Sequence, residues 1–136
     1  MKGSFELKVR FPVNPQTLYD AWLDSEEHSN MTGGKASCSN KEGEGFSAWD
    51  GYISGKTIQL YPHTKIIQSW RTADFKNKDE DSELIIEIQE TAEGSELLLI
   101  HKNIPEGQPD YQQGWIEHYF DPMKIYFDQK KNDNKK

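Results

Sequence analysis

Apolar and charged side chains alternate along residues 5–11, so that every second position is hydrophobic. This period of two is typical of a half-buried antiparallel strand, whose side chains point alternately to the core and to water. The strand is expected to end at Pro12, because proline donates no backbone hydrogen bond. The pattern therefore predicts that the chain opens with a strand that has one face in the core.

Two short helices are predicted directly after this strand. Asn14 followed by Pro15 is a helix start, because asparagine caps the first turn and proline is tolerated at the first helical position. Large apolar residues between positions 18 and 23 then fall on one helical face. A second helix over residues 25–31 is expected to stop at the glycine pair that begins with Gly33.

The middle of the chain changes to strand chemistry, with apolar and β-branched segments separated by turn-forming residues. Gly55 lies inside the second of these segments, and we expect a β-bulge there. The least buriable residue of a strand indicates which face points outward, which places Gln68, Trp70 and His101 on the inner face. The predicted antiparallel strands are residues 45–49, 51–60, 64–71, 84–90 and 96–102.

Residues 109–128 have the period of a long amphipathic helix. At about 100° per residue, the large apolar side chains fall within an arc of roughly 140°, and charged residues occupy the opposite face. Pro122 lies inside this helix and is expected to kink it. Such a face needs a concave apolar sheet to cover it. Its residues are Trp115, Ile116, Tyr119, Phe120, Met123, Tyr126 and Phe127.

Length and charge narrow the class of protein. The 136 residues fit one domain, which we expect over residues 1–128, followed by a disordered basic tail over residues 129–136. The net charge of −7 would repel phosphate backbones, so nucleic acid is not expected as a partner. The longest aliphatic run, residues 97–100, is too short for a membrane helix, and the alternating N-terminus is not a secretory signal. We expect no membrane partner and a cytoplasmic location.

The sequence contains none of the common catalytic motifs, such as a nucleophile elbow, a P-loop or a zincin helix. We therefore expect no catalytic residue, no metal and no cofactor. Cys38 is the only cysteine, which excludes a disulfide within the chain.

His63 is expected in a solvated turn and His118 on the flank of the last helix. His101 either forms a satisfied hydrogen bond in the core or presents a ring nitrogen to a ligand.

Two stretches carry a family resemblance. FSAWDGYISGKTIQLYPHTKIIQSWR (residues 46–71) and IPEGQPDYQQGWIEHYFDPMKIYF (residues 104–127) resemble the signature stretches of the C-terminal domain of the activator of the heat-shock protein 90 ATPase. That family belongs to the START-like (SRPBCC) helix-grip superfamily. The resemblance implies an α+β helix-grip fold with a curved antiparallel sheet of about six or seven strands. Two short helices would follow the first strand, and the long C-terminal helix would pack across the concave face.

The resemblance implies two functions. The first is a non-enzymatic domain that binds a hydrophobic small molecule between the sheet and the C-terminal helix, as related domains often enclose a cavity, although the same residues also fit a solid core. The second is a co-chaperone-like regulator that binds heat-shock protein 90 and stimulates its ATPase. We expect this chain to be a monomer and to lack the additional N-terminal domain of the family's two-domain co-chaperones. The expected ligand-binding residues are Gln68, Trp70, Leu99, His101, Trp115, Tyr119, Met123 and Tyr126.

Overall fold

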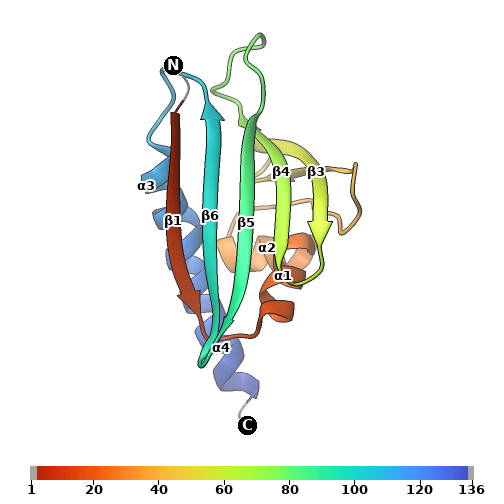
Figure 1. Cartoon of the computed structure of the whole chain (residues 1–136), viewed down its shortest axis with the longest axis vertical. Helices are drawn as coiled ribbons and strands as arrows, with labels where there is room; N and C mark the ends of the chain where they lie inside the picture. The colour runs from red at the N-terminus through yellow and green to blue at the C-terminus, as the bar shows by residue number, and fades with distance from the viewer. Residues whose placement is uncertain (1–2, 135–136) are drawn as a thin grey trace.

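The computed structural model describes residues 3–134, in which a curved antiparallel sheet carries all of the helices on one face (Figure 1). This arrangement confirms the predicted helix-grip fold, with six strands in the sheet. The elements in chain order are β1 (Gly3–Phe11), α1 (Pro15–Leu23), α2 (Ser25–Thr32), β2 (Gly45–Ala48), β3 (Ile53–Tyr61), β4 (Lys65–Thr72), β5 (Ser82–Thr91), β6 (Gly94–Ile104), α3 (Tyr111–Trp115), the π-helical turn η1 (Ile116–Phe120) and α4 (Asp121–Asn134).

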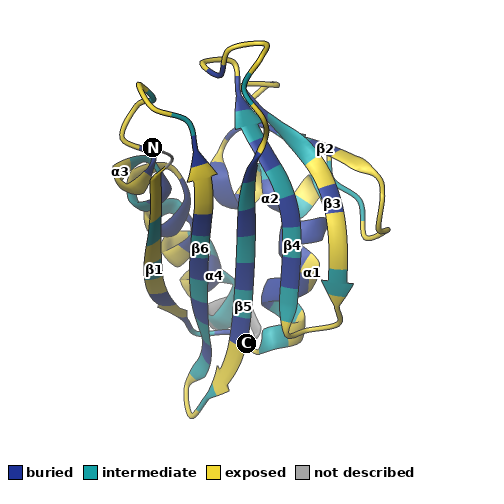
Figure 2. Ribbon diagram, turned by 45° about the horizontal axis from the view of Figure 1, so that its top comes forward, coloured by how far each residue is buried: buried dark blue, intermediate teal, exposed yellow. Residues whose placement is uncertain are grey.

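The strands follow the order β1-β6-β5-β4-β3-β2, and every neighbouring pair is antiparallel. Buried and partly exposed residues alternate along β4, β5 and β6, as Figure 2 shows. Gln68 pairs with Leu84, which in turn pairs with His101, and all three side chains are buried. The predicted inner face of these strands is therefore confirmed.

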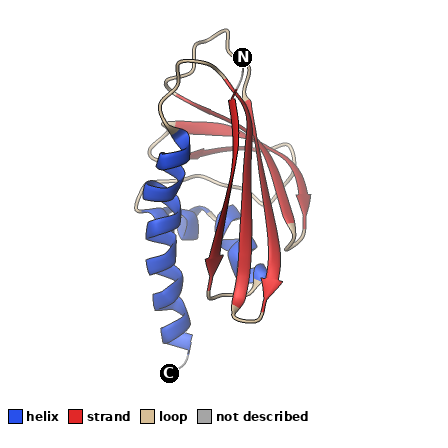
Figure 3. Cartoon of the chain, turned by 60° about the vertical axis from the view of Figure 1, so that its left-hand side comes forward, coloured by secondary structure: helices blue, strands red, loops and turns tan. Residues whose placement is uncertain are grey.

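The C-terminal helix lies beside this inner face. Figure 3 shows α3, η1 and α4 as one continuous rod next to the strands. Met123 and Phe127 of α4 are fully buried, and the ring of Phe127 packs edge-on against Phe11 of β1 with centroids 5.5 Å apart. Burial of a side chain of this size stabilises a fold by about 1.5–3 kcal/mol. The apolar face of the helix therefore holds the end of the chain on the sheet.

The terminal helix has a backbone irregularity directly before Pro122, where a kink was predicted. The turn before this proline is π-helical, over Ile116–Phe120, and α4 starts directly after it. A proline inside a helix lacks the N–H and crowds the carbonyl of the preceding turn, and a wider π turn relieves that contact. The proline is therefore accommodated by a change of helical pitch within the rod.

The terminal helix also extends beyond its predicted end at Asp128. Residues 129–134 are helical, and the ammonium group of Lys130 lies 2.8 Å from a carboxylate oxygen of Glu27 in α2. Residues 135–136 of the predicted tail lie outside the described residues. Within residues 3–134, no helix has both the length and the apolar character to cross a bilayer.

Gly55 of β3 does not form the β-bulge that was predicted there. The register shift between β3 and β4 falls between Thr57 and Gln59 instead. A Cβ atom at position 55 would lie 1.9 Å from the carbonyl oxygen of Ser69 and 2.7 Å from the ring of Phe46. The glycine is therefore required by the close approach of neighbouring groups, which is the other common role of glycine inside a strand.

Candidate functional site

A cleft of about 440 Å³ opens to solvent where the β2–β3 turn meets the first turns of the C-terminal helix. Its walls come from that turn, from β4, and from the helix with the loop before it. Most of the lining side chains are aromatic, and we call it the aromatic cleft. Its residues are Trp49, Tyr52, Ile53, Trp70, Pro109, Asp110, Tyr111, Gly114, Trp115, His118 and Tyr119.

The β2–β3 turn presents Trp49 to the cleft through a strained backbone. Trp49 and Asp50 have positive φ angles of 52° and 58°, which is uncommon for residues other than glycine and costly for a large aromatic one. The backbone N–H of Asp50 donates to the carbonyl of Lys35 at 3.0 Å and fixes the turn. A Cβ atom on Gly34 would lie 2.4 Å from the Trp49 ring. The chain after α2 therefore holds the indole in place.

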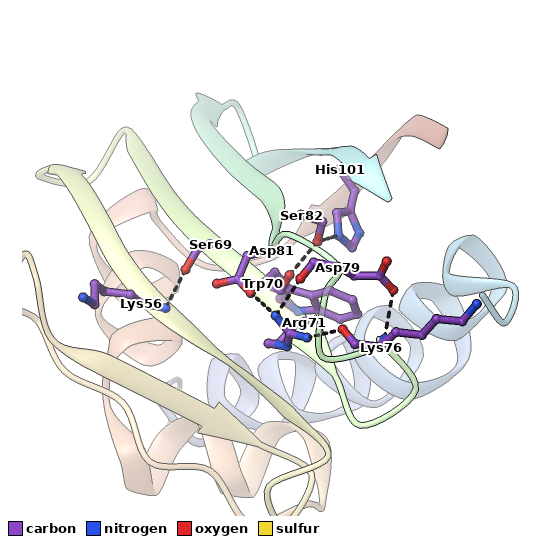
Figure 4. A network of polar contacts seen from close by, with 9 residues as sticks. All are labelled: Lys56, Ser69, Trp70, Arg71, Lys76, Asp79, Asp81, Ser82 and His101. Atoms are coloured by element: carbon purple, nitrogen blue, oxygen red, sulfur yellow. Dashed lines mark hydrogen bonds and ion pairs between the residues drawn. The ribbon is translucent and has the colours of Figure 1, made fainter. Parts of the chain in front are cut away.

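Two walls of the cleft, Trp70 and Trp115, are joined by buried hydrogen bonds through His101. The indole N–H of Trp115 can only donate, and it donates to Nδ1 of His101 at 3.1 Å. Nε2 of His101 therefore carries the proton and donates to Ser82 Oγ at 2.8 Å, and the Ser82 hydroxyl donates to the Trp70 carbonyl at 2.8 Å. Figure 4 shows the hydrogen bonds that link His101, Ser82 and Trp70. Burial lowers the pKa of His101 to about 3, so the ring is neutral at physiological pH.

The segment next to Trp70 is fixed by Arg71, which points away from His101 (Figure 4). Its guanidinium donates to the carboxylate of Asp81 at 2.7 Å and to the backbone carbonyls of Asp79 and Lys76 at 3.2 and 3.0 Å. One planar group thus ties the β4–β5 loop to the end of β4. The position of Trp70 is therefore set from both sides of the sheet.

A second histidine, His28 of α2, orients Tyr119 from behind the cleft. Nδ1 of His28 lies 2.8 Å from the carbonyl of Trp22, and since a carbonyl only accepts, this nitrogen carries the proton. Nε2 then accepts from the Tyr119 hydroxyl at 2.9 Å. Burial lowers the pKa of His28 and raises the pKa of Tyr119, so both groups stay neutral.

Phenol hydroxyls form the polar part of the rim. The Tyr111 hydroxyl donates to the Gln108 side chain at 2.7 Å, so it accepts from the Thr72 hydroxyl, 2.6 Å away. The Tyr52 hydroxyl donates to the carboxylate of Asp74. The pKa of Tyr52 is raised by burial and by this carboxylate, and burial raises the pKa of Tyr111 as well. These phenols act as neutral hydrogen-bonding groups.

The helix contributes one carboxylate and one glycine to the cleft. Asp110 is the N-cap of α3, and its Oδ1 accepts from the backbone N–H of Gln113 at 3.1 Å. Gly114 lies one turn further on, and a Cβ atom there would meet nothing within 4 Å. At this point the helix leaves open space in the cleft.

Three of the sequence-predicted ligand-binding residues, Trp70, Trp115 and Tyr119, line the cleft. Two others, Leu99 and Met123, are fully buried in the core and lie outside this lining. They pack between the sheet and the middle of the terminal helix, where the interior is filled.

The remaining three predicted residues make polar contacts away from the cleft. His101 is buried behind Trp115, and Gln68 accepts from the Trp22 indole at 3.3 Å while donating to Thr57 at 3.2 Å. Tyr126 donates to Glu27 on the far side of α2. Burial and these partners explain why the structure does not bring them to the cleft.

Sequence reasoning missed the residues at the mouth of the cleft. Tyr111, Gly114 and His118 share one helical face with Trp115 and Tyr119, at spacings of three and four residues. Extending the apolar face by one turn toward the helix start would have included Tyr111 and Gly114, and widening it by one position would have included His118. As expected, His63 is exposed in its turn. Within residues 3–134, no three His, Cys, Asp or Glu side chains are placed together to hold a metal ion.

Known proteins resemble this chain in sequence and in fold. The sequence profile of the family described as Activator of Hsp90 ATPase homolog 1-like protein matches residues 12–128. A Dictyostelium discoideum protein described as "Activator of 90 kDa heat shock protein ATPase homolog" is 27% identical over 128 residues, which cover 91% of this chain and 33% of that protein. An uncharacterized Schizosaccharomyces pombe protein is 25% identical over 86% of this chain and 35% of its own length. The chain thus spans about a third of these curated relatives.

Solved structures share the fold at lower sequence identity. An HSP90 activator from Plasmodium falciparum superposes with a TM-score of 0.80 at 24% identity, covering 90% of this chain and 94% of that one. A Mesorhizobium loti protein gives a TM-score of 0.78 at 14% identity, covering 93% and 98% of the two chains. CalU16 from Micromonospora echinospora gives 0.75 at 20% identity, covering 90% and 73%.

Proposed function

The chain belongs to the Activator of Hsp90 ATPase homolog 1-like family, and from this premise we propose that it is a non-catalytic domain that binds a hydrophobic small molecule in the aromatic cleft. The cleft volume of about 440 Å³ falls within the range of small-molecule sites. Its walls are aromatic, and its polar groups are few and fixed. Those are the features expected of a site that receives an apolar ligand in one orientation.

The observation that carries this proposal is Gly114. Glycine inside a helix is less favourable than alanine by about 0.8–1 kcal/mol. Nothing within 4 Å would obstruct a Cβ atom at this position, so packing does not require the glycine. Gly114 does line the cleft. The glycine therefore costs the helix stability at a position that lines the cleft. This cost is consistent with a cleft that must stay open.

Titration with a panel of fatty acids, sterols and small aromatic compounds tests the proposal. The four indole N–H groups are separate NMR reporters, since Trp49, Trp70 and Trp115 line the cleft and Trp22 donates to Gln68 in the core. We expect saturable shifts at the first three and the smallest shift at Trp22. A panel without saturable binding, or with its largest shift at Trp22, would refute cleft binding.

Gly114→Leu provides the matched variant, because it fills the cleft from a position with room for a side chain. Gln112→Leu adds the same side chain at an exposed position of the same helix. We expect Gly114→Leu to abolish binding and Gln112→Leu to retain it. Equal affinity of both variants for the panel would count against the cleft as the binding site.

A second candidate function is regulation of heat-shock protein 90, acting in the cytoplasm. Its support is the Dictyostelium relative, whose name describes an activator of the 90 kDa heat shock protein ATPase and of which this chain spans a third. A bound regulator changes a chaperone cycle only through different affinities for its conformations. ATP turnover by the host's own heat-shock protein 90 should therefore rise on addition of this protein. Unchanged turnover at saturating protein would exclude this function.

A further inference from the structure

We propose that the aromatic cleft selects a cationic apolar ligand, an ammonium group carried on an aromatic or branched alkyl body. This inference rests on the proposed function, because it names the chemical class of molecule that would enter the same cleft. It follows from two properties of the lining: the faces of its rings and the sign of its charge.

The first property is the density of aromatic rings around one small volume. Trp115 lies with its ring centroid 5.7 Å from that of Trp70 and 4.6 Å from that of Tyr119. Trp49, on the β2–β3 turn, packs edge-on against His118 of the helix with ring centroids 5.6 Å apart. The faces of such rings carry negative electrostatic potential, and several of them around one space are the arrangement that attracts ammonium groups.

The second property is that the formal charge of the lining is negative. Asp110 contributes a carboxylate, and none of the described residues that line the cleft is a lysine or an arginine. Asp74 adds a carboxylate beside the rim through its bond with Tyr52. The whole chain carries a net charge of −7, so the surroundings reinforce this sign.

Asp110 is placed to act on a ligand as well as on the helix. Its Oδ1 caps the first turn by accepting from the backbone N–H of Gln113. The negative charge of the carboxylate compensates the positive end of the helix dipole, which would otherwise repel a cation. Among residues 3–134, no hydrogen bond engages Oδ2, and the residue is exposed at the cleft. An ammonium group inside the cleft would therefore meet ring faces and an available carboxylate oxygen.

Three compounds of similar shape test the charge preference: benzyltrimethylammonium, its uncharged isostere neopentylbenzene, and the anion phenylacetate. Dissociation constants come from the indole N–H shifts at low salt and about pH 8, above the usual range of imidazole titration. We expect the cation to bind about tenfold more tightly than the isostere, and the anion to bind most weakly. Equal affinities, or tighter binding of the anion, would overturn the cation preference while leaving cleft binding intact. Failure of all three to bind would overturn this inference, whereas the proposed function is refuted only if the fatty acids, sterols and aromatic compounds of the wider panel also fail to bind.

Asp110→Asn tests the role of the carboxylate, because asparagine caps a helix about as well as aspartate. Asp128→Asn removes the same charge at an exposed position further along the same helix. We expect Asp110→Asn to weaken binding of the cation about fivefold and to leave the neutral isostere unchanged, while Asp128→Asn alters neither. An equal loss for cation and isostere in Asp110→Asn would mean that the residue only shapes the helix, and would overturn its proposed electrostatic role.

Discussion

Two glycines in regular secondary structure, Gly55 and Gly114, have opposite surroundings. At Gly55 in β3, a Cβ atom would lie 1.9 Å from a backbone oxygen, so no side chain fits. At Gly114 in α3, a Cβ atom would meet nothing within 4 Å. The fold therefore requires the first glycine, whereas the second one keeps space free in the cleft.

Alanine at these two positions should change stability in opposite directions. We expect Gly114→Ala to raise the free energy of unfolding by about 0.5–1 kcal/mol, because alanine is the better helix former. Gly55→Ala should lower it by about 1–3 kcal/mol through overpacking against Ser69 and Phe46. Urea unfolding of both variants measures the two values. A destabilised Gly114→Ala would mean that this glycine has a structural role after all.

His101 and His28 are buried neutral, and this makes stability depend on pH. An unfolded histidine binds a proton below about pH 6.5, whereas the pKa of His101 in the folded chain is lowered by burial to about 3. The unfolded state therefore binds more protons in acid, and stability is lost as the pH falls from the unfolded value toward the folded one. The pKa of His28 is lowered as well, which gives a second contribution of the same sign.

We expect the free energy of unfolding to fall between about pH 7 and about pH 5, and the contribution of His101 to this fall should be about 2 kcal/mol. Urea unfolding at the two pH values measures the difference. His63→Gln, at an exposed turn position, is the control and should leave the pH dependence unchanged. Constant stability over this interval would contradict the neutral state assigned to the two buried rings.

At the scale of elements, two consecutive residues of α2 hold the terminal helix at two separate places along that helix. His28 accepts from Tyr119 near the cleft, and Glu27 accepts from Tyr126 and Lys130 in α4. Burial alone would raise the pKa of Glu27, but the hydrogen bonds from Lys130 and Tyr126 outweigh it and lower the pKa. The carboxylate therefore favours the docked position of α4 when it is ionised.

Removing this carboxylate should loosen the end of α4 more than the rest of the fold. We expect Glu27→Gln to cost less than about 1 kcal/mol, since the group is partly exposed. Backbone amides in the last turns of α4 should exchange faster, while those of β5 and β6 stay protected. Glu26→Gln, a neighbouring exposed carboxylate in the first turn of α2, is the control. Equal protection of α4 in both variants would contradict the proposed tether.

At the scale of the whole molecule, periodicity was sufficient to predict the strands, the inner face and the long terminal helix. These features follow from buried residues at every second position, such as Ile66 and Trp70 in β4, with more exposed residues between them. The position of the cleft could not be predicted in the same way. It depends on the register that brings the β2–β3 turn to the helix start, and on a backbone strain at Trp49 that no local propensity favours.

The ligand-binding residues predicted from the sequence centre on the inner face of the sheet, and only Trp70, Trp115 and Tyr119 of them line the cleft. Leu99 and Met123 have the apolar character of a ligand pocket, yet they fill the interior themselves. Only the three-dimensional packing distinguishes core residues from lining residues, because both have the same period and composition. Gly114 is the exception, since a glycine in an otherwise regular helix is visible in the sequence alone.

The most direct measurement is of intermolecular nuclear Overhauser effects from the tightest-binding compound of the titrations. Binding in the aromatic cleft predicts contacts with the ring protons of Trp49 and Trp115, and no contacts with the methyl groups of Leu99 and Met123. Contacts restricted to the outer face of the sheet, or to the core residues, would contradict it.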